Sequence, residues 1–140
     1  MSVRFFLDTN VVVYAMSGKV PSKAVIASRL VEEAIGSGKG IISFQVVQEF
    51  FSVAFRRFNP PMSLAEAEQV LAVTFRPLLA VHSAYPLYGR ALELCRRYSL
   101  SWYDSLIVAA AIEGGCGILY SEDLQHGQKF DSVVVRNPFV

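Results

Sequence analysis

The stretch FFLDTNVVVY, residues 5–14, places a carboxylate between two apolar runs. The segment VRFFL, residues 3–7, is short and largely apolar, and this predicts a buried β-strand that ends at Asp8. Asp8 has two interpretations at this point. Either it caps a helix that follows the strand, or it belongs to a functional site. The choice depends on whether other carboxylates occur in equally apolar surroundings.

The rest of the chain alternates short apolar segments with longer amphipathic segments, which is typical of an α/β fold. Further strands are predicted at 40–43, 78–81, 117–120 and 132–135, and helices at 22–37, 44–58, 63–75, 84–98 and 101–115. Ser63 and Glu66 form the pattern of a capping box. The sequence therefore predicts a parallel sheet of about five short strands with helices on both faces.

Length and composition restrict the class of protein. The chain has 140 residues, so we expect a single domain over 1–140. It is 53% hydrophobic, but no apolar run approaches the roughly 20 residues that span a bilayer. No secretory signal is recognisable, and Cys95 and Cys116 fit reduced thiols. We expect a cytoplasmic protein that does not enter a membrane.

Four acidic residues lie where acids are usually unfavourable: Asp8, Glu49, Asp104 and Asp123. Asp8 and Asp123 follow predicted strands, and Asp104 shares a helical stripe with apolar residues. A structural role is possible for each of these three, because Asp8 and Asp123 could be helix caps and Asp104 lies three residues after Ser101. Taken singly, capping is favoured for Asp104 and is evenly balanced for Asp8.

Glu49 is harder to explain by capping. It lies in the second turn of its predicted helix, among valine and phenylalanine residues. An unpaired buried carboxylate costs several kcal/mol or shifts its pKa until it is neutral, and a metal ion removes this conflict.

The predicted topology brings these acids toward one edge of the sheet, because ligands of open α/β sheets bind at the carboxyl ends of strands. No Cys or His joins them, so a metal would have oxygen ligands only, which suits Mg²⁺ or Mn²⁺. Such a site fits metal-assisted hydrolysis of a phosphodiester, with one or two ions.

Four motifs now make a resemblance specific. FLDTNVVVYA, VVQEF, WYDSLIVAAA and ILYSEDLQHG resemble, in order and spacing, the motifs of PIN-domain ribonucleases, and most closely the VapC-type toxins of type II toxin–antitoxin pairs. The resemblance covers nearly the whole chain. It implies a cytoplasmic, Mg²⁺- or Mn²⁺-dependent endoribonuclease whose metal ligands are Asp8, Glu49, Asp104 and Asp123.

The same resemblance implies further residues and partners. Asn10 and Ser121 would support the acids by hydrogen bonding, although each could also be an ordinary first-turn or turn residue. Glu122 competes with Asp123 for the last position, and Asp123 is preferred because the family pattern places its acid there. An RNA substrate, a small antitoxin and a homodimer are the expected partners. The alternatives are a PIN-fold RNA-processing nuclease without an antitoxin, and an inactive binding module.

The distribution of charge is compatible with RNA. Setting the four acids aside from the 12 Asp and Glu residues leaves eight acids against 13 Lys and Arg residues. The candidate contacts are Arg56, Arg57, Arg96 and Arg97, with solvated arginines as the alternative. Phe55 and Phe58 could stack on bases, but a core role is favoured for both.

Two other classes of α/β protein fit poorly. Phospho-accepting receiver domains carry paired acids after the first strand and an Asp after the third, where this chain has His82. Aspartate-nucleophile phosphatases carry two acids in a DxD pattern, and here the third position is Asn10.

Overall fold

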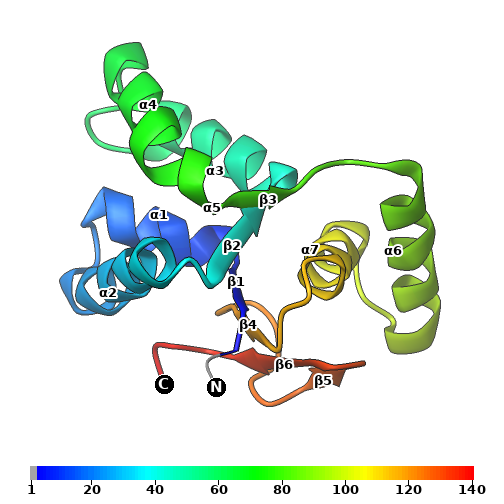
Figure 1. Ribbon diagram of the computed structural model, residues 1–140. Coiled ribbons are helices and arrows are strands. Elements are labelled where there is room, and N and C mark those ends of the chain that lie inside the picture. Colours follow the sequence, from blue (N-terminus) through cyan, green and yellow to red (C-terminus); the bar gives the residue numbers. More distant parts are fainter. Residues whose placement is uncertain (1–2) are drawn as a thin grey trace.

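The computed structural model describes residues 3–140, and these form an α/β domain built on a mostly parallel sheet (Figure 1). The strands are β1 (Phe5–Leu7), β2 (Gly40–Ser43), β3 (Leu79–Val81), β4 (Ile118–Tyr120), β5 (Lys129–Phe130) and β6 (Val133–Arg136). Their order across the sheet is β3-β2-β1-β4-β6-β5, and only the β5–β6 pair is antiparallel. The predicted fold class is confirmed.

Helices cover both faces of this sheet, as expected for parallel strands. In Figure 1, α1 (Thr9–Ser17) and α2 (Pro21–Ser37) lie on one side, and α6 (Tyr85–Tyr98) and α7 (Trp102–Glu113) lie on the other. Helices α3 (Phe44–Arg57), α4 (Leu64–Val70) and α5 (Arg76–Leu78) gather toward the β3 end.

The boundaries of several elements differ from the predicted ones, most of them by one or two residues. The predicted helix over 63–75 is α4 followed by a π-helical turn, η1 (Leu71–Phe75), which leads into α5. Strand β5 was not predicted, because a two-residue strand is too short to show an alternation. The last strand lies one residue further along the chain than the predicted 132–135.

The core lies between the sheet and its helices. Helix α7 is buried continuously from Ser105 to Ala111, so it packs on all sides instead of presenting one apolar stripe. Gly40 allows close packing of α2 on β2, because a Cβ atom there would lie 2.1 Å from the Cβ of Ala34. None of the helices within residues 3–140 has the length and apolar character needed to cross a bilayer.

The strand order reverses between β1 and β4, and this places two chain exits together. The strands are parallel neighbours with Leu7 opposite Tyr120, and the backbone N–H of Asp8 donates to the carbonyl oxygen of Tyr120 at 3.0 Å. Asp8 and Ser121 therefore leave the sheet side by side, at a topological switch point where α/β folds bind their ligands.

Candidate active site

Asp8 is the buried centre of the candidate site. It is 6% exposed and its carboxylate accepts hydrogen bonds from the Thr9 backbone N–H at 2.7 Å and from the Ser121 hydroxyl at 2.8 Å. The first bond caps α1, so the capping interpretation of Asp8 is confirmed. Ser121 is fully buried and donates to Asp8, which is the kind of contact that the family resemblance implies for it.

Burial determines the protonation of Asp8. Desolvation raises the pKa of Asp8 to about 7, and the negative charges of Asp123 and Glu49 add to this effect. The hydrogen bonds from Ser121 and Thr9 lower the pKa, but they do not outweigh the burial. No Lys or Arg pairs with Asp8 among the ion pairs of residues 3–140. The carboxylate therefore lacks a positive partner.

The first turn of α1 connects Asp8 to two of the other acids. The Thr9 hydroxyl donates to Glu49 Oε1 at 2.6 Å, and the Asn10 amide donates to Asp123 Oδ2 at 3.0 Å. These four side chains line an open groove of about 540 Å³. The structure therefore brings Asp8, Glu49 and Asp123 into one neighbourhood, with Asn10 bonded to one of them as expected.

Gln45 links Glu49 to the start of α7. It is 3% exposed, and its amide nitrogen lies 3.3 Å from Glu49 Oε2 and 3.1 Å from the carbonyl oxygen of Tyr103. Its carboxamide oxygen is buried and has no hydrogen-bond partner within the described part of the chain. An orphaned buried oxygen of this kind is unfavourable by about 1–3 kcal/mol unless something else satisfies it.

Asp104 lies next to Tyr103 in the first turn of α7 and is half-buried. Its backbone N–H donates to the Ser101 hydroxyl at 3.2 Å, so Ser101 caps the helix. The capping box at Ser63 and Glu66 has both of its bonds, whereas within residues 3–140 the Asp104 carboxylate makes no return bond to Ser101. The carboxylate of Asp104 is therefore not used by the cap.

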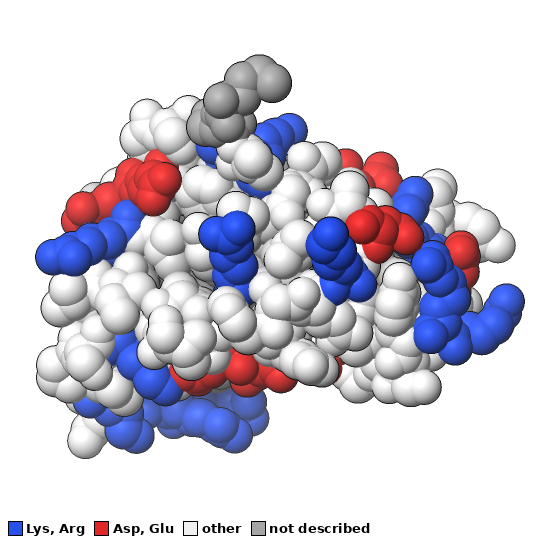
Figure 2. Space-filling view, turned by 90° about the horizontal axis from the view of Figure 1, so that it is seen from below, with Lys and Arg blue, Asp and Glu red and all other residues white. Residues whose placement is uncertain are grey.

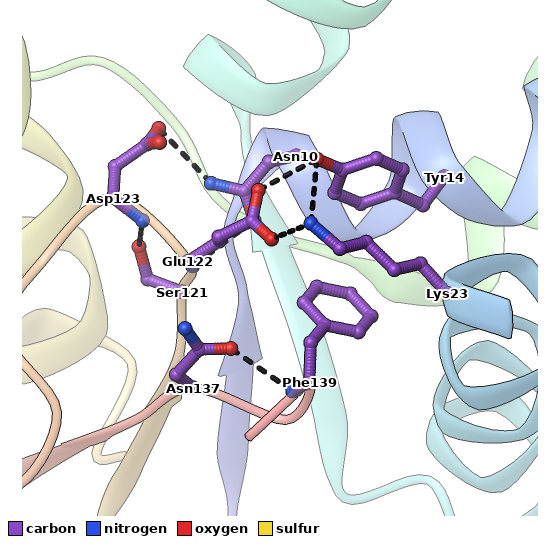
Figure 3. Close-up of polar contacts among 8 residues, drawn as sticks. All are labelled: Asn10, Tyr14, Lys23, Ser121, Glu122, Asp123, Asn137 and Phe139. Carbon is purple, nitrogen blue, oxygen red and sulfur yellow. Dashed lines mark hydrogen bonds and ion pairs between the residues drawn. The ribbon is translucent and has the colours of Figure 1, made fainter. Parts of the chain in front are cut away.

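Glu122 is engaged elsewhere (Figure 3). It accepts a hydrogen bond from the Tyr14 hydroxyl at 2.6 Å and forms an ion pair with Lys23. Burial by itself would raise the pKa of Glu122, but the bonds from Lys23 and Tyr14 outweigh it and lower that pKa. In Figure 3 the carboxylates of Glu122 and Asp123 diverge, Glu122 toward Lys23 and Asp123 toward Asn10.

Phe139, near the end of the described chain, packs against the residues of the Lys23–Glu122 ion pair and its neighbour Tyr14. The Phe139 ring packs edge-on against the Tyr14 ring, with centroids 5.1 Å apart, and the Lys23 ammonium lies 5.5 Å from the Phe139 centroid. Asn137 holds the turn by accepting a bond from the Phe139 N–H at 2.9 Å (Figure 3). We refer to Tyr14, Lys23, Glu122 and Phe139 as the tail clamp.

The chemistry of the donors fits a hard divalent cation. Carboxylate and amide oxygens are the ligands that Mg²⁺ and Mn²⁺ prefer, and the orphaned Gln45 oxygen and the uncompensated Asp8 carboxylate both favour a positive charge nearby. Within residues 3–140, however, no three Asp, Glu, His or Cys side chains are arranged closely enough to hold one ion. The expectation that four carboxylates already surround a common point is therefore not met.

Hydrogen bonding is the physical reason for this spacing. Thr9 holds Glu49 and Asn10 holds Asp123, whereas within residues 3–140 no hydrogen bond links the Asp104 carboxylate to the other acids. Carboxylates without a cation repel one another, and Asp8, Glu49 and Asp123 are each stabilised by a separate hydrogen-bond donor.

The candidate RNA-contacting arginines differ in their surroundings. Arg56 folds back onto Ser52, and Arg97 pairs with Asp131 at 3.3 Å. Arg57 lines the acidic groove. On the face seen in Figure 2, the acidic and basic residues form small separate groups.

Two phenylalanines were expected in the core. Phe58 is half-buried and contacts the Phe50 ring edge-on. Phe55 is 39% exposed and stacks on Phe51, so the core prediction is wrong for Phe55. Its helix turns this position outward, because the core-facing positions are Val46, Phe50 and Ala54 at spacings of four.

Sequence reasoning missed Thr9, Gln45 and the tail clamp. Gln45 lies four residues before Glu49 on the same face of α3, and this spacing is the signal that could have identified it. Thr9 and Lys23 carry no such signal, because their partners are distant in the sequence.

Comparison with known proteins shows which family has this fold. The PIN domain family model matches residues 5–129. The structure resembles VapC20 of Mycobacterium tuberculosis, a toxin that cleaves the sarcin-ricin loop, with 21% identity, a TM-score of 0.62, and coverage of 85% of this chain and 89% of that one. It also resembles a toxin–antitoxin complex from Klebsiella pneumoniae, with 18% identity, a TM-score of 0.65, and coverage of 95% and 96%. No curated protein matches it. The family model spans most of the chain and begins at the strand that ends in Asp8, and the chain therefore belongs to the PIN domain family.

Proposed function

We propose that the chain is a metal-dependent endoribonuclease and the toxin of a type II toxin–antitoxin pair. The observation that carries the proposal is the buried Asp8 carboxylate at the switch point, close enough to Glu49 and Asp123 for their charges to raise its pKa. Membership of the PIN domain family and likeness to VapC20, a toxin that cleaves an RNA loop, support this reading.

The ligands of Mg²⁺ or Mn²⁺ would be Asp8, Glu49, Asp104 and Asp123. When bound, the metal supplies Lewis-acid chemistry: it lowers the pKa of a water molecule and stabilises the charge that develops during phosphodiester hydrolysis. Ser121 orients Asp8, Asn10 orients Asp123, and Thr9 with Gln45 orients Glu49. These residues position the carboxylates on which the reaction depends.

The test of the nuclease uses purified protein and a structured RNA. We expect cleavage at few positions with Mg²⁺ or Mn²⁺, none with EDTA, and none by Asp8→Asn in the presence of metal. Cleavage that persists in EDTA would contradict the metal mechanism.

An antitoxin would cover an exposed apolar surface on α3, α4 and η1. Leu64 is 74% exposed, Leu71 46% and Val73 58%, which is unusual for large apolar side chains of a small domain. The likeness to a toxin–antitoxin complex supports a protein partner, and the exposed apolar side chains are the reason for placing it on this surface. An arginine of that partner could pair with the carboxylates and displace the metal.

Co-expression tests the toxin role. A small reading frame directly upstream of this one should relieve growth arrest caused by the chain, and its product should co-purify with the chain. Growth arrest that the upstream product does not relieve would remove the toxin–antitoxin role and leave the nuclease proposal standing.

A further inference from the structure

A second groove lies next to the acidic one, between the end of α1, the end of α3 and the loop that leads to α4. Its volume is about 460 Å³, within the range of roughly 300–1,000 Å³ that is usual for small-molecule sites. The residues that matter here are two cations, Lys19 and Arg57, and three apolar side chains, Met16, Phe58 and Met62.

Arg57 connects the two grooves. It lines the second groove and also the acidic groove that contains Glu49 and Asp123. It lies in the last turn of α3, eight residues after Glu49, on the same helix. A strand of RNA with a phosphate at the carboxylates would therefore pass Arg57 if it continued into the second groove.

The charges of the second groove favour an anion. Neither Lys19 nor Arg57 takes part in an ion pair within residues 3–140. Glu66 is the one acid among the residues that line this groove, and its carboxylate accepts the Ser63 backbone N–H at 3.1 Å in the capping box, so two cations face a single acid. The guanidinium of Arg57 is thus available to a phosphate, with which it can form paired hydrogen bonds.

The apolar side chains give the same groove a surface for a base. Phe58 is half-buried, with its ring edge-on to Phe50, and Met16 and Met62 are half-buried beside the groove. Thioether and aromatic side chains pack well against the flat face of a base.

We propose that the second groove binds one nucleotide of the RNA next to the cleaved phosphodiester, with Arg57 on its phosphate and Phe58, Met16 and Met62 against its base. This inference rests on the proposed ribonuclease function and adds the position of the flanking nucleotide. It also separates Arg57 from the neighbouring Arg56, whose guanidinium bonds to Ser52 instead.

Binding without cleavage tests the phosphate contact. The affinity of a fluorescent eight-nucleotide single-stranded RNA is measured in EDTA at several salt concentrations, for the wild type, Arg57→Ala and the matched control Arg56→Ala. We expect Arg57→Ala to weaken binding about 5-fold or more and to reduce the salt slope by about 0.7, the value for one phosphate on a single strand. Arg56→Ala should stay within about 2-fold.

Photocrosslinking tests the base contact. An RNA with a single 4-thiouridine beside the cleavage position should crosslink, in EDTA, to peptides that contain Met16, Phe58 or Met62. Equal effects of Arg56→Ala and Arg57→Ala, or crosslinks that all fall outside these peptides, would overturn the proposal.

Two further outcomes separate the claims. If wild-type protein cuts RNA with metal but Arg57→Ala binds RNA normally, the nuclease stands and the nucleotide site falls. If Arg57→Ala loses the antitoxin and keeps its RNA affinity, the groove is a peptide site and the proposal is overturned.

Discussion

Asp8 combines a capping contact with burial next to two other carboxylates, and these two effects act on stability in opposite directions. The pKa of Asp8 rises from 3.8 to about 7 on folding, so the folded protein retains a proton that the unfolded chain has lost. In metal-free protein this contribution to stability is complete below about pH 4 and is lost as the pH rises toward 7. Its size is on the order of 4 kcal/mol.

Asp8→Asn tests this balance. Asparagine caps helices as well as aspartate does and can bond to Ser121, but it carries no charge. In EDTA at pH 8 we expect the variant to be more stable than the wild type, and near pH 4 the difference should vanish. Urea unfolding at several pH values measures it. A variant that is less stable by the same amount at every pH would show that the capping contact dominates.

A substitution at Asp104 can change catalysis without changing stability, because Ser101 caps this helix and the Asp104 side chain is not part of the cap. We expect Asp104→Asn to reduce the rate of RNA cleavage by about 100-fold or more, since the proposed metal would lose the charge of one ligand. The melting temperature without metal should be unchanged or slightly higher. The matched control is Glu113→Gln at the other end of α7, which should cleave normally. Near-normal cleavage by Asp104→Asn would remove it from the site.

Some residues of the candidate site could be predicted from the sequence and others could not, and the difference has a physical reason. Asp8 and Glu49 could be identified because a charged group among apolar neighbours is unfavourable unless it has a use. Thr9 and Gln45 are ordinary helix residues in sequence, and their partners are known only once α1 and α3 are packed together. Phe55 was placed in the core because an aromatic residue gives no indication of which side of its helix is covered.

At the scale of elements, the loop after β4 is fixed to α1 and α2 by the tail clamp. Glu122 bonds to Tyr14 and Lys23, and its backbone N–H donates to Asn10 at 3.3 Å. Asn10 in turn donates to Asp123. The clamp therefore sets the position of the loop that carries Asp123, although Glu122 itself faces away from the groove.

A charge exchange tests the clamp. Lys23→Glu and Glu122→Lys should each lower the melting temperature in EDTA and raise the Mg²⁺ concentration needed for half-maximal cleavage. The double variant should recover most of both losses, because the ion pair is restored with its signs reversed. If Glu122 were instead a metal ligand, the double variant would recover stability and not the Mg²⁺ dependence.

The element boundaries show where periodicity is informative. The α/β alternation and the capping box at Ser63 follow directly from apolar spacing and cap residues, and both are confirmed. The π-helical turn at 71–75 could not be predicted from the sequence. It uses the same kinds of residue as the α-helix before it and differs only in its hydrogen-bond spacing. Strand β5 exists only because β6 lies beside it.

For the whole molecule, the proposed metal site would link folding to metal binding. An ion that binds only the folded state at 100 times its Kd stabilises it by about 2.7 kcal/mol. We therefore expect saturating Mn²⁺ to raise the melting temperature by several degrees relative to an ionic-strength-matched control. Glu49→Gln combined with Asp8→Asn should abolish this increase. A similar increase in that double variant would place the ion elsewhere.

The exposed apolar side chains of α4 and η1, which we propose an antitoxin covers when it is present, lead to a prediction about the assembly of the chain on its own. We expect the purified chain, whose mass is 15.5 kDa, to scatter light as a particle of twice that mass. Replacing Leu71 by Lys should shift the mass toward the monomer if this surface forms the contact, whereas Leu92→Lys on α6 serves as the control. A monomer at micromolar concentration would contradict the homodimer.

The short edge strands of the sheet restrict how a partner protein can bind. Its outer strands are β3, with three residues, and β5, with two, and β5 runs against the direction of the others. An incoming strand would find few free N–H and C=O groups on either side, so the domain offers little template for extension of the sheet or for edge-to-edge aggregation. A partner protein therefore has to recognise side chains on the helices and in the grooves, and exposed backbone would contribute little to its affinity.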